Sequence, residues 1–328
     1  MKKIAFLFPG QGSQSVGMGY DFYQEYDIVR ELFDMAEDLV KLPIRKLCFK
    51  GPMEDLTMTI HLQPAITAVN LSILRVLEKE GFHGDVSAGH SLGEYSALCA
   101  AKVLKSENAI LSVMKRGELM HREALKYKGA MTAILGLTID TVASVVEEAQ
   151  SAGTVSIANH NTERQIVITG SPAAVDKAAA LAVAQKGKAI PLKVSGAWHS
   201  ELIKGAENDF KNFLDTIPFK PPVHPVLHNA TAAVASDPDA IRDVMVRQLC
   251  HPVRWHETLK QLMKDQVNVF VEIGPGKVLS GMLKKTMPAD YSGMIFAVNT
   301  LKSLEVCLKE IGYALIRGNI HLSVERRS

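Results

Sequence analysis

The sequence contains little cysteine, and its cysteines are scattered. Only four occur among 328 residues, at positions 48, 99, 250 and 307, and their spacing matches no metal-binding motif. Isolated cysteines of this kind are typical of reduced thiols in a cytosolic protein. We therefore expect a cytoplasmic protein without a metal site.

An excess of charge of one sign and long apolar runs are also missing. The formal net charge is +2 at pH 7, which argues against nucleic acid as a bulk electrostatic partner. No stretch approaches the roughly 18 apolar residues of a membrane helix, so we expect no membrane partner. The apolar run Ile4–Phe8 follows two lysines, but it is too short for a signal peptide and is better interpreted as a buried strand.

The most informative stretch that is present runs from Gly89 to Gly93 and has the pattern G-x-S-x-G around Ser91. In a nucleophile elbow, this pattern places a serine on a tight turn between a strand and a helix, and the glycines relieve backbone crowding. The context agrees, because Asp85–Ala88 could end a strand and Leu92–Lys102 is rich in helix formers. Backbone N–H groups at the helix start could then stabilise an oxyanion. A chance match in a glycine-containing turn is the competing interpretation.

A second glycine pattern, Gly10-x-Gly12, follows the first apolar run. It lacks the third glycine of a dinucleotide-binding fingerprint, because Ser15 stands at that position. We interpret this stretch as a flexible loop beside the site, in which Gln11 is free to offer a donor.

Hydrophobic patterns divide the chain into two regions. Helical spacing covers Asp21–Leu42, and Pro64 predicts a helix that begins at Gln63. From Gly129 the expected order is β-α-β-β-α-β, which is the ferredoxin-like unit, with Ala158–Asn161 near its central hairpin turn. We therefore predict an α/β fold: an α/β-hydrolase-like catalytic domain with a parallel sheet, made of residues 1–128 and 196–328, and an inserted ferredoxin-like subdomain of residues 129–195.

Two further side chains have competing interpretations. Arg116 lies on a helical face with Met120, and an arginine there is ordinarily a solvated surface charge; the alternative is a buried guanidinium that clamps a substrate carboxylate. His199 follows the inserted region at a domain junction, where clefts form. A lone histidine is usually structural, but a serine nucleophile needs a base of this kind.

Seven motifs occur in order along the chain, and together they resemble the malonyl-CoA:acyl-carrier-protein transacylases of type II fatty acid synthesis. Discrete acyltransferases of polyketide synthesis are close relatives of that family. The resemblance extends from Ile4 to about Ala314. The motifs are Phe8–Gln14, Gln63–Ala65, Gly89–Glu94, Arg116-Gly117, Gly196–Ser200, Val246–Leu249 and Glu272–Gly276.

The resemblance implies a role for each matching residue. Ser91 would be the nucleophile and His199 the general base, oriented by the backbone carbonyl of Gln248. The N–H groups of Gln11 and Leu92 would form the oxyanion hole. Arg116 would bind the malonyl carboxylate, with Met120, Gln63, Asn161 and Trp198 around the acyl group. In polyketide acyltransferases an aromatic residue at the Trp198 position accompanies malonyl, whereas serine accompanies the methyl-branched unit; tryptophan is bulkier than the usual phenylalanine.

The resemblance also implies substrates and partners. Malonyl-CoA would donate the acyl group, an acyl carrier protein would accept it on phosphopantetheine, and no cofactor would be needed. The enzyme would be a monomer. Three alternatives stay open: a discrete trans-acting acyltransferase of polyketide synthesis, an acyl-thioester hydrolase on the same scaffold, and a catalytically silent module that docks carrier proteins. A basic patch for an acidic carrier could include Lys193, Lys204, Lys277, Lys284 and Lys285.

Overall fold

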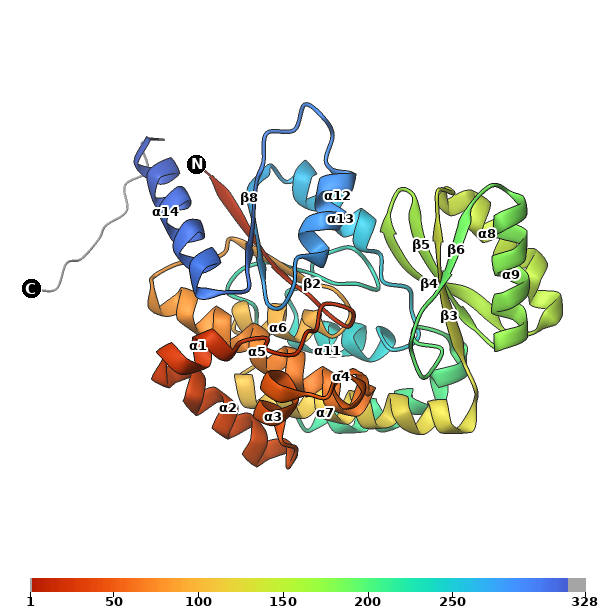
Figure 1. The fold of residues 1–328 in the computed structure, drawn as a ribbon, viewed down its shortest axis with the longest axis horizontal. Helices are drawn as coiled ribbons and strands as arrows, with labels where there is room; N and C mark the ends of the chain where they lie inside the picture. The colour runs from red at the N-terminus through yellow and green to blue at the C-terminus, as the bar shows by residue number, and fades with distance from the viewer. Residues whose placement is uncertain (1, 318–328) are drawn as a thin grey trace, which may run out of the picture.

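The computed structural model describes residues 2–317, and its centre is a five-stranded parallel sheet with the order β7-β2-β1-β8-β9 (Figure 1). Alternate residues of β1 enter different hydrophobic clusters: Phe6 and Phe8 face one side of the sheet, and Ala5 and Leu7 face the other. Because both faces are covered, the strands are continuous apolar runs, as expected for a parallel sheet. The strands are β1 (Lys3–Phe8), β2 (Val86–Gly89), β7 (Val226–Leu227), β8 (Val267–Ile273) and β9 (Met294–Val298).

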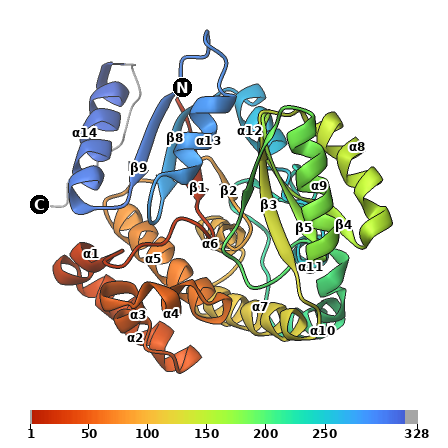
Figure 2. The same cartoon turned by 45° about the vertical axis from the view of Figure 1, so that its right-hand side comes forward.

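Helices cover both faces of this sheet. Figure 2 shows α12 and α13 on one side, with α14 beside β9. The helices of this region are α1 (Tyr20–Glu25), α2 (Asp27–Val40), α3 (Ile44–Lys50), α4 (Met53–Thr57), α5 (Thr59–Lys79), α6 (Gly93–Ala100), α7 (Ser106–Lys126), α10 (Glu207–Asp215), α11 (Pro238–Arg247), α12 (Trp255–Lys264), α13 (Val278–Thr286) and α14 (Leu301–Arg317), with a 3-10 turn, η2, at Glu201–Ala206.

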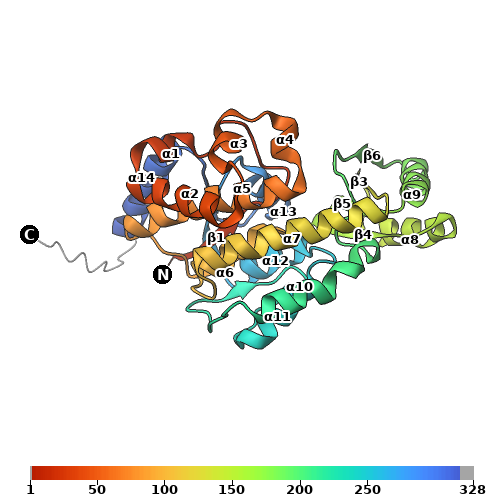
Figure 3. The same cartoon turned by 90° about the horizontal axis from the view of Figure 1, so that it is seen from below.

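A second, antiparallel sheet has the order β4-β5-β3-β6, which is the ferredoxin-like arrangement predicted from the element order. The long helix α7 reaches toward it from the larger part (Figure 3). This sheet has its own apolar cluster, and we therefore propose that residues 129–195 form the inserted subdomain. Its elements are β3 (Ala130–Leu135), α8 (Ile139–Ala149), the 3-10 turn η1 (Gln150–Ala152), β4 (Val155–Thr162), β5 (Gln165–Gly170), α9 (Pro172–Ala184) and β6 (Lys188–Pro191).

Three local predictions were wrong. The expected helix over Asp21–Leu42 is interrupted at Tyr26, whose backbone is extended. Helix α5 begins at Thr59 rather than Gln63, so Pro64 lies inside it, near its start. Residues Ala158–Asn161 lie within β4 rather than at a turn. Register shifts in β4 break the alternation of side chains there, so the sequence pattern ended the predicted strand at Ala158 instead of Thr162.

Helix α5 shows that the prediction of no apolar stretch as long as a membrane helix was wrong. It is long and apolar enough to cross a bilayer by length and hydropathy alone, with a mean hydropathy of 1.3 over 18 residues. However, 83% of that window is buried inside the protein, between the sheet and neighbouring helices, as in the core helix of a globular fold.

Candidate active site

Ser91 lies on the tight turn between β2 and α6, as the G-x-S-x-G pattern predicted. Its φ angle is +51°, a left-handed conformation that costs a non-glycine residue about 1–3 kcal/mol. The glycines are required by crowding: a Cβ on Gly89 would lie 2.1 Å from the carbonyl carbon of Gly93, and a Cβ on Gly93 would lie 2.1 Å from the carbonyl oxygen of Phe8. The turn therefore holds the hydroxyl out from the strand end.

His199 completes a serine–histidine pair across 108 residues of sequence. The Ser91 Oγ lies 2.9 Å from His199 Nε2, and His199 Nδ1 lies 2.9 Å from the backbone carbonyl oxygen of Gln248. The carbonyl can only accept a hydrogen bond, so Nδ1 carries the proton and Nε2 is free to accept from the serine. This arrangement follows the logic of a catalytic triad with a carbonyl in place of the acid.

Burial controls the protonation of this histidine. Desolvation and, next, the positive charge of Arg116 lower the pKa of His199 to about 3, and the hydrogen bond to the Gln248 carbonyl opposes part of the shift. The imidazole is therefore neutral, and able to act as a base, at every pH well above 3.

We accordingly expect the reaction of Ser91 with a fluorophosphonate to keep a constant rate from pH 8 down to about pH 5. The reason is that a lowered pKa moves the loss of the neutral base to more acidic pH. The measurement is the labelling rate against pH, with circular dichroism confirming that the protein stays folded. A rate that fell by half near pH 6.5, the ordinary pKa of histidine, would contradict this expectation.

Arg116 is buried, with 1% of its surface exposed, so the surface-charge interpretation is wrong. Its Nη2 donates to Ser91 Oγ at 3.0 Å, and its Nη1 donates to Gln63 Oε1 at 3.1 Å. Gln63 Nε2 in turn donates to the sulfur of Met120 at 3.2 Å. No aspartate or glutamate forms a salt bridge with Arg116 in the described part of the chain, and burial lowers the pKa of its guanidinium. Within residues 2–317 the site thus contains a buried cation that forms no salt bridge, although the charge of the more distant Glu94 acts on it and raises the pKa of its guanidinium.

A cavity of about 90 Å³ joins most of the predicted site residues. Arg116, Met120 and Trp198 line it together with the serine and the histidine. Gln11 and Leu92 also line it, and their backbone N–H groups donate to no protein acceptor within residues 2–317. Two free N–H groups beside a serine hydroxyl are the arrangement that an oxyanion hole requires.

Asn161 and Gln63 lie outside this cavity. Asn161 lines a neighbouring cavity of about 300 Å³ that shares Gln11 and His90 with the first, and its Oδ1 lies 2.9 Å from His90 Nε2. Among the described residues, the Gln63 side chain hydrogen-bonds to the site through Arg116 and Met120. The larger cavity is lined in part by residues of the second sheet, among them Ala133 and Val167.

Sequence reasoning missed several residues around the serine. Asn159 lines both cavities, and Asn229 and Glu94 surround the elbow through hydrogen bonds. Glu94 stood in the elbow motif itself, and its place three residues after the serine on a buried helix was the available signal. Asn229 carried no such signal, since it lies 138 residues from Ser91 in the sequence, in the turn that follows β7.

Comparisons with known proteins agree with this geometry. The chain matches the family described as acyl transferase domain over residues 5–303. A malonyl CoA-acyl carrier protein transacylase of Bacillus subtilis is 42% identical, and the match covers 87% of this chain and 90% of the relative. The polyketide biosynthesis malonyl CoA-acyl carrier protein transacylase PksC of the same species is 38% identical over 86% of this chain and 96% of the relative.

A solved structure shows the same fold. It is a malonyl-transacylase in complex with a holo type II polyketide synthase acyl-carrier protein, and it matches with a TM-score of 0.90 and 36% identity. The match covers 94% of this chain and 100% of the solved chain. Extended similarity in sequence and structure, together with the serine–histidine geometry, leads to one conclusion: the chain belongs to the acyl transferase domain family.

Proposed function

We propose that this protein moves the malonyl group of malonyl-CoA to the phosphopantetheine thiol of an acyl carrier protein, through a malonyl ester of Ser91. The observation that carries this proposal is Arg116, a buried guanidinium that touches the Ser91 hydroxyl and has no carboxylate partner in the described part of the chain. An unpaired buried charge is costly, and a substrate carboxylate would satisfy it. Malonyl carries such a carboxylate at its free end, whereas a plain acyl group does not.

The geometry supports a two-step exchange. Ser91 Oγ attacks the thioester carbon while His199 Nε2 takes the hydroxyl proton, and the oxyanion is held by the N–H groups of Gln11 and Leu92. The carbon–sulfur bond then breaks, and His199 returns the proton to the leaving thiol. In the second step the carrier thiol gives its proton to His199 and attacks the malonyl ester. The carbon–oxygen bond then breaks, and His199 returns the proton to Ser91 Oγ. The reaction written in this way consumes no cofactor.

The phosphopantetheine arm of the carrier would enter through the larger cavity, and the carrier itself would dock at its rim. Lys193 lines that cavity, and Lys277 directly precedes α13, which contributes Val278 and Met282 to its wall. These lysines support the proposal of a basic rim for an acidic carrier. With Lys204 in η2 and Lys284 and Lys285 near the end of α13, they form the predicted docking set. We propose that the enzyme acts as a cytoplasmic monomer.

A second candidate is transfer to a carrier of polyketide synthesis. The similarity to PksC and to the transacylase solved with a polyketide carrier favours it. The two candidates share the same chemistry on Ser91 and differ only in the carrier that discharges the ester. Purified carriers of both kinds, offered separately to the malonyl-enzyme, would distinguish them by their discharge rates.

The test of the function is the intact mass of the protein after brief mixing with malonyl-CoA. We expect a malonyl adduct that maps to Ser91 and disappears when a carrier protein bearing phosphopantetheine is added. Acetyl-CoA is the matched comparison, and it should give less adduct because it cannot pair with Arg116. An adduct that decays equally fast without a carrier would identify a hydrolase instead. A protein that reacts with neither thioester nor fluorophosphonate would be the silent docking module.

A further inference from the structure

Behind the serine–histidine pair lies a buried carboxylate that the proposed transfer does not use. Glu94 is fully buried in the first turn of α6. Its oxygens accept from His228 Nδ1 at 2.7 Å, from the backbone N–H of Asn229 at 3.1 Å and from Gln248 Nε2 at 2.6 Å. No lysine or arginine forms a salt bridge with it in residues 2–317. Three donors converging on one buried carboxylate make a rigid anchor.

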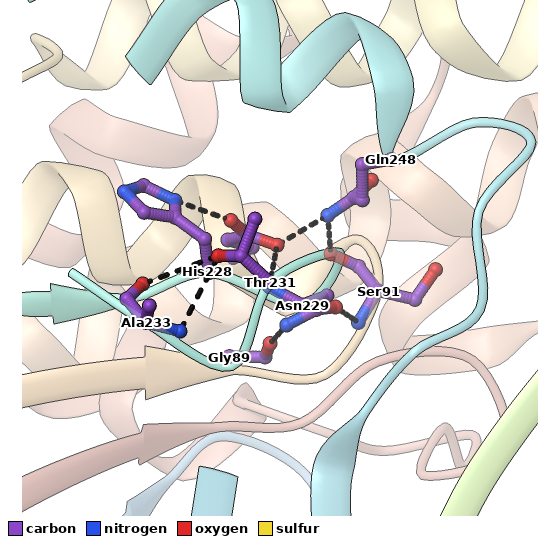
Figure 4. A network of polar contacts seen from close by, with 8 residues as sticks. Gly89, Ser91, His228, Asn229, Thr231, Ala233 and Gln248 are labelled. Atoms are coloured by element: carbon purple, nitrogen blue, oxygen red, sulfur yellow. Dashed lines mark hydrogen bonds and ion pairs between the residues drawn. The ribbon is translucent and has the colours of Figure 1, made fainter. Parts of the chain in front are cut away.

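One arm of this anchor holds the backbone of the nucleophile turn. The side-chain oxygen of Asn229 accepts from the backbone N–H of Ser91 at 2.6 Å, and its Nδ2 donates to the carbonyl oxygen of Gly89 at 2.7 Å. Figure 4 shows the Asn229 side chain between Gly89 and the backbone of Ser91. Asn229 thus clamps the residues on either side of His90, while its own backbone N–H is fixed on Glu94.

The other arm joins the nucleophile to the base. Gln248 Nε2 donates to the carbonyl oxygen of Ser91 at 2.9 Å as well as to Glu94. The backbone carbonyl of the same residue accepts from His199 Nδ1. A shift of Gln248 would therefore move the support of Ser91 and the acceptor that orients His199 at the same time.

This support matters because both partners have left-handed backbones. The φ angles of Ser91 and His199 are +51° and +59°. The Ser91 N–H donates to the Asn229 side chain rather than to the backbone of a neighbouring strand. We infer that Glu94 is a positioning residue that fixes the serine and the histidine relative to each other through Asn229 and Gln248. The inference rests on the proposed function only in taking Ser91 and His199 as the reacting pair.

The test is the E94Q variant, which removes the negative charge that the three hydrogen bonds share and leaves one acceptor oxygen in place of two. We expect the rate of Ser91 labelling by a fluorophosphonate, and kcat for malonyl transfer per folded protein, to fall about 100-fold, the scale of effect of a misplaced reacting group. The KM for malonyl-CoA should stay near the wild-type value, because Arg116 is unchanged. The Nδ1 proton resonance of His199, assigned by its loss in H199A, should shift.

The matched control is E272Q. Glu272 is also fully buried and accepts from the N–H groups of Leu279 and Ser280, at 3.0 and 2.7 Å, away from the serine. We expect this variant to lower the melting temperature without changing the labelling rate. If E94Q behaved like E272Q, with a lower melting temperature but an unchanged labelling rate and His199 resonance, Glu94 would be structural only and the inference would be wrong.

Two more variants keep the test decisive if E94Q does not fold. N229D retains the oxygen that accepts from Ser91 but loses the donor to Gly89, and Q248M removes the Nε2 donor but keeps the backbone carbonyl. Each should slow labelling, and wild-type rates in both would overturn the inference. Fluorophosphonate labelling involves no acyl substrate. Failure of malonyl transfer in the wild type would therefore contradict the proposed function alone, and the positioning role would still be tested.

Discussion

Replacing His199 with alanine is expected to lower kcat for malonyl transfer about 10⁴-fold, the upper range for loss of a general base. The 2.9 Å contact between Ser91 Oγ and His199 Nε2 provides the only histidine nitrogen within hydrogen-bond distance of the hydroxyl among the described residues. Without it, the serine must lose its proton to water in a buried site. The measurement is single-turnover formation of the malonyl-enzyme, followed by intact mass.

The chain contains a matched control for this variant. His224 is also hydrogen-bonded to a serine, with its Nε2 2.7 Å from Ser87 Oγ, but neither residue lines the cavity that holds Ser91. Partial burial lowers the pKa of His224 to about 4, so this histidine, like His199, is neutral at pH 7. The H224A variant should keep the wild-type rate of malonyl-enzyme formation. A rate in H199A within tenfold of the wild type would exclude His199 as the base.

The second large effect is expected at Arg116. Changing it to alanine should lower kcat/KM for malonyl-CoA roughly 150-fold. This factor corresponds to a loss of about 3 kcal/mol of transition-state stabilisation, as when one partner of a buried charge pair is truncated. Transfer or hydrolysis of an acetyl group should increase, because the variant cavity is larger and no longer contains an unpaired cation. The measurement is kcat/KM for malonyl-CoA and acetyl-CoA side by side.

Two variants separate the charge from other effects. R116K retains a positive charge but loses the paired N–H groups that contact Ser91 and Gln63, so we expect partial malonyl transfer. R122A removes an arginine from the same helix that is partly exposed and bonded to Asp209, and it should leave both substrates unaffected. Equal losses with malonyl-CoA and acetyl-CoA in R116A would show that Arg116 supports the serine rather than the carboxylate.

Local sequence patterns that do not depend on distant parts of the chain determined much of the fold. The run Ile4–Phe8 is apolar throughout because both faces of its strand are buried, and the strand was predicted on that basis. The elbow was visible because crowding around Ser91 permits only glycine at positions 89 and 93. The order of elements in residues 129–195 was sufficient to predict the ferredoxin-like arrangement, in which β3 pairs with β5 and β6 rather than with β4.

The chemistry of the site was decided only by the tertiary structure. Ser91 and His199 are 108 residues apart, and no local pattern distinguishes His199 from ten other histidines; the resemblance to a family selected it. The burial of Arg116 depends on which face of α7 meets α5, whereas the sequence alone favoured a surface charge. The contacts of Glu94 with His228, Asn229 and Gln248 span more than 130 residues each, and such long-range hydrogen bonds leave no periodic trace in a sequence. Local backbone sterics and apolar spacing therefore determined the elements, and long-range packing determined which side chains meet.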